Sequence, residues 1–135
     1  MTQNNGSMFV LVPQRTAWWP VAFTVPAEDD AGYVVEQTIE MKFRFIDDGA
    51  LTELTQKAGT IDASSTLTPA QKIAEVYMGI VADWRGVGES KDKPLPFTRD
   101  NFAMLLQSLP GFDRRALLPA YTQCLGGEGK VRTGN

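Results

Sequence analysis

The sequence predicts an α+β fold in which an N-terminal antiparallel β-hairpin, or small sheet, packs against about four α-helices. Residues 33–46 alternate between apolar and polar side chains, as in a strand buried on one face. Between residues 73 and 84, apolar side chains recur at steps of three and four, as on the buried stripe of a helix. Because the strand-like segments precede the helix-like ones, the order favours α+β over an alternating α/β fold.

The length of the chain indicates a single domain. It has 135 residues, enough to bury a core without disulfides or metals. We predict a disordered leader over residues 1–7, one α+β domain over residues 8–125, and a flexible, glycine-rich tail over residues 126–135.

Composition and charge exclude several classes of partner. With 13 Lys and Arg against 16 Asp and Glu, the net charge is −3, and no long basic run is present, so nucleic acid is not an expected partner. No apolar run reaches the roughly 18 residues that a membrane span needs, so no membrane partner is expected either. The polar start does not resemble a signal peptide, which predicts a cytosolic protein.

The residue inventory offers no catalytic set. There is no histidine and one cysteine, Cys124, which excludes His-based nucleophile systems, an internal disulfide and Cys-based zinc sites. The acidic pairs at residues 29–30 and 47–48 lie at turn or cap positions, which explains them without catalysis. We therefore expect a non-enzymatic protein with no metal or cofactor.

Two strands form the predicted hairpin. The first covers residues 18–25, and Pro20 makes it an edge strand or delays its start, because proline cannot donate to a ladder. An acidic turn over residues 27–32 follows. The second strand covers residues 33–46 and turns six side chains to the core: Val35, Gln37, Ile39, Met41, Phe43 and Phe45.

Capping residues mark the first two helices. Asp47 or Asp48 caps a helix that Gly59 ends. Thr68, Pro69 and Gln71 then give a strong helix start. We predict that this second helix continues to Trp84 and covers the hairpin.

A loop over residues 85–97 leads to the last two helices. Thr98 caps the third helix, which ends at residues 110–111 (Pro-Gly). The fourth is predicted over residues 112–125, where Pro119 should kink it or delay its start.

The aromatic residues are the candidates for protein binding. Trp18 and Trp19 are adjacent, so in a strand they point to opposite faces and at most one reaches a given core. Either both are structural, or one is an exposed anchor for a partner. Trp84, on the predicted apolar stripe, is more typical of core, and Phe97 completes the candidate set.

Five short motifs resemble those of the tail assembly chaperones of long-tailed bacteriophages. They are residues 8–13 (MFVLVP), 15–21 (RTAWWPV), 43–45 (FRF), 81–87 (VADWRGV) and 94–101 (PLPFTRDN), and the resemblance covers most of residues 8–121. The loop over residues 89–93 departs from the family, which has an acidic turn ending in glycine there, whereas this chain has two lysines.

The resemblance implies a protein that binds the long helical tape measure protein and helps the tail tube protein to assemble around it. It also implies action in the cytoplasm of the infected bacterial host and absence from the mature virion. Helix-in-groove binding and weak self-association are expected. The alternative is a structural tail-completion or head-tail joining protein, which purified virions would contain.

The resemblance further implies a longer product made by ribosomal slippage near the end of the gene. Glu128, Gly129 and Lys130 can be encoded by a slippery heptanucleotide, although Gly-Lys is also an ordinary dipeptide of a solvated tail. The codons of these three residues distinguish the two.

Overall fold

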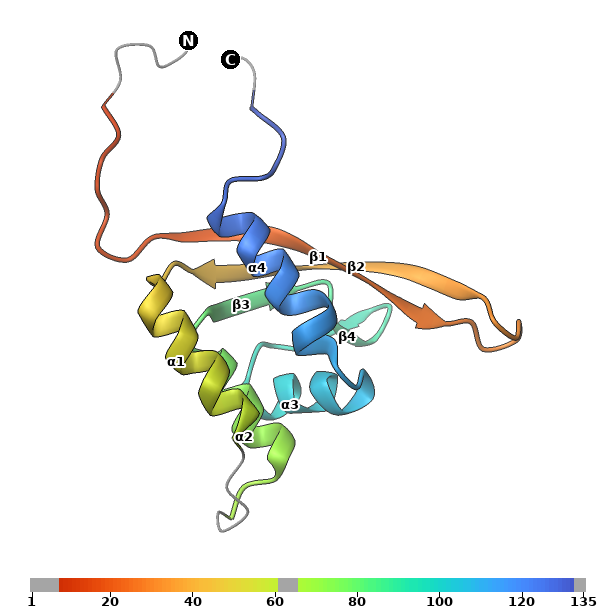
Figure 1. The fold of residues 1–135 in the computed structure, drawn as a ribbon. Helices are drawn as coiled ribbons and strands as arrows, with labels where there is room; N and C mark the ends of the chain where they lie inside the picture. The colour runs from red at the N-terminus through yellow and green to blue at the C-terminus, as the bar shows by residue number, and fades with distance from the viewer. Residues whose placement is uncertain (1–7, 61–65, 133–135) are drawn as a thin grey trace.

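The computed structural model describes residues 8–60 and 66–132 and has the predicted α+β fold, with a three-stranded antiparallel sheet, a two-stranded sheet and four α-helices (Figure 1). The elements are β1 (Thr16–Pro26), β2 (Val34–Arg44), α1 (Asp48–Gly59), α2 (Pro69–Tyr77), β3 (Val81–Arg85), β4 (Gly88–Ser90), β5 (Lys93–Pro94), α3 (Arg99–Ser108), the π-helical turn η1 (Asp113–Leu117) and α4 (Leu118–Leu125).

The hairpin of β1 and β2 is paired along its whole length, from Thr16 opposite Arg44 to Pro26 opposite Val34. The period-two alternation places one face of each strand inward, and the inward side chains nearest the helices are fully or almost fully buried: Val21, Ile39, Met41 and Phe43. Towards its turn the hairpin extends past the helices (Figure 1), and Val35 is 45% exposed. The hairpin therefore has a core-forming half and an overhanging half.

Strand β1 can contain Pro20 because β1 lies at the free edge of the three-stranded sheet. The sheet order is β1-β2-β3, so β1 is an edge strand, which was one of the two predicted alternatives; the other, a start after Pro20, is wrong because β1 begins at Thr16. Odd-numbered residues of this segment bond to β2: the Arg15 carbonyl accepts from the Phe45 N–H, and the Ala27 N–H donates to the Tyr33 carbonyl. Pro20 and the other even-numbered residues of β1 therefore face the open edge, where no N–H is required.

The predicted helix starts are confirmed. The Asp47 side chain accepts from the Ala50 N–H at 2.8 Å at the start of α1. At α2, Thr68 and Gln71 form a capping box, with Pro69 at the first helical position. The Thr98 hydroxyl caps α3 through the Asn101 N–H at 3.1 Å. Each cap satisfies backbone donors that a helix terminus leaves unpaired, which is why these starts can be predicted.

The prediction that the second helix runs to Trp84 is wrong. Helix α2 ends at Tyr77, a tight turn follows, and residues 81–85 form β3, which pairs with β2. The pairing contains a β-bulge: Phe43 lies opposite Val81 and Lys42 opposite Asp83, so Ala82 is the extra residue. The bulge lets Val81 and Trp84, three residues apart, both face the core, and this spacing imitates a helical stripe.

The helices that pack on the hairpin also differ from the prediction. Helix α4 and the turn η1 pack on β1, whereas α2 packs on α1 and α3. The predicted fourth helix begins as the π-helical turn η1, in which the Leu118 N–H donates to the Asp113 carbonyl. Pro119 is the second residue of α4 and directly follows this π-helical turn, so the helical segment starts near residue 112 as predicted, and only its regular α-helical part begins later, at Leu118. Within the predicted loop over residues 85–97, β4 and β5 form a small hairpin.

Tyr121 fastens α4 to the end of β2. Its hydroxyl donates to the Arg44 carbonyl at 2.7 Å and accepts from the Ile46 N–H at 3.2 Å. Its ring meets Phe43 edge to face, with centroids 5.1 Å apart. These contacts fix the point at which the chain leaves the sheet for α1.

A second buried tyrosine predicts a loss of stability in alkali. The Tyr77 hydroxyl donates to Asp113 Oδ2 at 3.0 Å, and burial together with the Asp113 carboxylate raises the pKa of Tyr77 above its usual value of about 10. Because the unfolded chain ionises first, the stabilisation is complete below pH about 10 and is lost as the pH rises towards the folded pKa. We expect the free energy of unfolding to fall more steeply above pH 10 in wild type than in Tyr77→Phe, measured by urea titration. Equal slopes would contradict this.

Candidate partner-binding surface

The described part of the chain shows neither a metal-binding cluster nor a membrane-spanning helix. Among residues 8–60 and 66–132, no group of three or more His, Cys, Asp or Glu side chains is placed to hold a metal ion. None of the described helices is long and apolar enough to cross a membrane. The features that remain to be explained are exposed aromatic and apolar side chains, which are typical of protein-binding surfaces.

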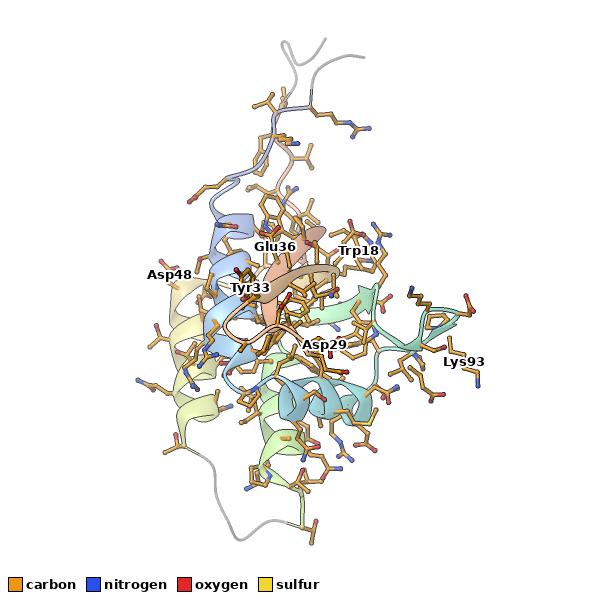
Figure 2. All side chains as sticks on the ribbon, turned by 90° about the vertical axis from the view of Figure 1, so that its right-hand side faces the viewer. Trp18, Asp29, Tyr33, Glu36, Asp48 and Lys93 are labelled. Atoms are coloured by element: carbon orange, nitrogen blue, oxygen red, sulfur yellow. The ribbon has the colours of Figure 1, made fainter. Side chains whose placement is uncertain are left out.

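Trp18 lies on the outer face of the sheet. Its neighbours across the strands are Lys42 on β2 and, beyond that, Asp83 on β3, both of which point away from the core. Figure 2 shows Trp18 on the side of the sheet away from α4. The indole is half-buried although it lies outside the core, so a neighbouring side chain must cover part of it.

That neighbour is Arg85, at the end of β3. Its guanidinium carbon lies 4.0 Å from the centroid of the Trp18 ring, and its Nε donates to Glu40. The Arg85 and Glu40 side chains are both about half exposed, at 57% and 46%. An ion pair with this exposure contributes about 1 kcal/mol or less, and an exposed cation–π contact contributes about 0.5 to 1 kcal/mol, so moving Arg85 off the indole costs at most about 2 kcal/mol. Trp18 is therefore a covered but accessible anchor.

Trp19 points the other way, as the adjacency of the two residues predicts. It is half-buried, packs against the core and is covered by the tail that follows α4. A Cβ at Gly129 would lie 2.7 Å from Cη2 of Trp19, so a side chain there would force the tail or the ring to move. Trp19 thus joins β1 to the C-terminal segment.

Trp84 and Phe97 belong to an aromatic cluster in the core. Trp84 is 5% exposed, and its ring meets Phe97 and Phe102 edge to face at centroid distances of 5.2 and 6.1 Å. Its indole N–H donates to the Leu95 carbonyl at 2.8 Å. The core interpretation of Trp84 is confirmed. Phe97 is half-buried, and its ring packs on Phe102 of α3. This contact attaches the segment that follows β5 to α3.

The structure also exposes apolar surface that the sequence reasoning did not assign to binding. Residues 8–12 are each between 49% and 89% exposed. At the hairpin tip, Tyr33 and Val34 are 69% and 61% exposed. A cleft of about 530 Å³ lies under the overhanging half of the hairpin, lined mainly by Phe23, Pro26, Leu109, Pro110, Phe112 and Ala116. Of these surfaces, residues 8–12 could have been identified from the sequence, because they form the unbroken apolar run MFVLV.

No protein-family model, curated protein or solved structure matches this chain. The functional assignment therefore depends on the residues themselves and on the arrangement described above.

Proposed function

We propose that this protein is a bacteriophage tail assembly chaperone, which binds the helical tape measure protein and assists assembly of the tail tube protein around it. The protein would act in the cytoplasm of the infected host without catalysis and would be absent from the finished particle. The observation that carries the proposal is the position of Trp18. It lies within residues 15–21, one of the motifs that resemble the family, and it is the large aromatic side chain on the outer face of the sheet.

The surroundings of Trp18 support binding of an amphipathic helix. The outer face presents the flat indole beside Glu40, Lys42 and Asp83, charges of both signs that can pair with the polar flank of a helix. Tryptophan is enriched at binding hot spots because one side chain buries a large apolar area. The Arg85 guanidinium that now covers the ring can turn to the rim of the interface and remain solvated there.

The proposal predicts different outcomes for the two adjacent tryptophans. Trp18→Ala should remain folded and lose at least about tenfold in affinity for helical segments of the tape measure protein, measured by isothermal titration calorimetry. Trp19→Ala should instead lower the melting temperature, because it empties the space between β1 and the tail. Tyr33→Ala is the matched control: it removes an aromatic ring that is 69% exposed at the hairpin tip, and affinity should not change.

Three results would contradict the proposal. Wild-type protein that does not bind the tape measure protein would refute the function. Normal binding by folded Trp18→Ala would refute the surface. Detection of the protein in purified virions by mass spectrometry would favour the alternative, a structural tail-completion or head-tail joining protein.

A further inference from the structure

The molecule carries two apolar features at opposite ends of its sheet; in the first the Arg15 guanidinium carbon lies 4.9 Å from the Phe9 ring centroid, and in the second Phe23 meets Phe112 edge to face, with centroids 5.3 Å apart. One is the N-terminal segment, residues 8–12, which has the sequence MFVLV and extends from the start of β1. The other is the hairpin cleft, defined by the lining residues Phe23, Thr24, Pro26, Ser108, Leu109, Pro110, Phe112, Arg115 and Ala116. Figure 1 shows the N-terminal segment leaving the sheet at the end opposite the hairpin turn.

The N-terminal segment can bring at most its first two residues to the cleft of its own chain. Val12, the last residue of the segment, precedes Thr16, the first residue of β1, by four residues, which gives a reach of about 14 Å, and Met8, the first residue of the segment, precedes it by eight, which gives about 27 Å. Phe23, the first cleft residue on β1, lies seven residues beyond Thr16, or about 24 Å along the strand. Even when the chain folds straight back, only Met8 and Phe9 come level with Phe23, and Val10, Leu11 and Val12 stop about 4 to 10 Å short of it.

We infer that the N-terminal segment of one copy of this chain docks in the hairpin cleft of a second copy. The contact is heterologous, because the two surfaces are different, so each bound copy still presents one free segment and one free cleft. The protein then associates head to tail into short chains or a closed ring. This inference does not depend on the identity of any helical partner.

The chemistry of the two surfaces is complementary. Residues 8–12 carry no charge, and the cleft walls are formed by aromatic, leucine and proline side chains. Arg15 follows the segment, and the acidic residues Glu28, Asp29 and Asp30 follow the cleft residue Pro26, so opposite charges flank the two surfaces. Arg115, which is exposed on the cleft wall, has donors for the carbonyl groups of an extended segment.

The free edge of β1 is a poorer acceptor for the same segment. Strand addition needs a row of outward-facing N–H groups, and Pro20 and Pro26 interrupt that row on β1. Side-chain burial in the cleft does not require this row. The cleft is therefore the docking site that the observations favour.

Two charge substitutions test the inference by sedimentation velocity on the full chain. Leu11→Asp places a charge in the segment at a residue that is 85% exposed, so folding should be unaffected. Ser108→Lys places a charge at the cleft in the last residue of α3, where a cation is favourable for the helix. We expect the sedimentation coefficient of wild type to rise with concentration and each variant to stay monomeric. Val131→Asp, an equal change at a tail residue that is 87% exposed, is the matched control and should associate as wild type does.

Mixing the two variants distinguishes this mode from others. Leu11→Asp keeps an intact cleft and Ser108→Lys keeps an intact segment, so an equimolar mixture should form one-to-one dimers and nothing larger. A strictly monomeric wild type at millimolar concentration would overturn the inference. So would association of Leu11→Asp equal to that of wild type, or a mixture that stays monomeric. None of these results bears on the Trp18 surface, so the two proposals fail independently.

Discussion

Ile39→Asp is expected to destabilise the protein by about 3 kcal/mol or more, because it places a carboxylate without a partner in the core. Ile39 is 6% exposed and lies on the inner face of the central strand β2. Gly86 packs directly against it: a Cβ at that position would lie 3.6 Å from the Ile39 Cα. Water therefore has little room to enter and solvate a charge there. Urea denaturation followed by circular dichroism measures the change.

Val35→Asp is the matched control for this substitution. Val35 is on the same strand and the same face, four residues away, but lies on the overhanging half of the hairpin and is 45% exposed. We expect it to cost less than about 1 kcal/mol, because the new carboxylate stays hydrated. Equal effects of the two substitutions would mean that the core does not end at Ile39.

Trp84→Ala is expected to cost about 3 to 5 kcal/mol, the range for removing a large aromatic side chain from a core. The substitution removes the edge-to-face contacts with Phe97 and Phe102 and leaves the Leu95 carbonyl without its donor. It also detaches β3 from the segment that leads into α3. The unfolding midpoint in urea and the near-ultraviolet circular dichroism signal should both fall.

Trp84→Phe separates the two parts of this effect. It keeps an aromatic ring near Phe97 and Phe102 but loses the indole N–H, so the cost should be clearly smaller than for alanine. An unfolding midpoint of Trp84→Ala equal to that of wild type would contradict the structural role of the cluster and restore Trp84 as a candidate for binding.

Local signals in the sequence were sufficient for much of the fold. The alternation in residues 33–46 predicted β2, and Pro20 narrowed β1 to an edge strand or a later start, of which the edge position is correct. Thr68 and Thr98 predicted two helix starts to the residue, because capping depends on side chains within three residues of the helix terminus. Such features could be predicted because the residues that determine them lie close together in the sequence.

The end of α2 and the strand β3 could not be predicted in this way. Val81 and Trp84 have helical spacing, and the partner that makes them a strand, β2, lies about forty residues earlier. The binding surfaces were predictable only in part. Adjacency predicted that Trp18 and Trp19 would face opposite ways, but not which of them faces out. The hairpin cleft is formed by residues 23–26 and 108–116, and only the tertiary fold brings these together.

The extra residue in β3 has a consequence for how the chain can change in length. If Ala82 were deleted, Phe43, Lys42 and Met41 could keep their partners Val81, Asp83 and Trp84 in an unbroken ladder. Sequence variants of this protein that lack residue 82 would therefore retain the fold. Their segment would show plain alternation of buried and exposed side chains, so its strand would be recognisable from sequence alone. The one extra residue, Ala82, is thus enough to make a strand unrecognisable from the sequence without changing the architecture.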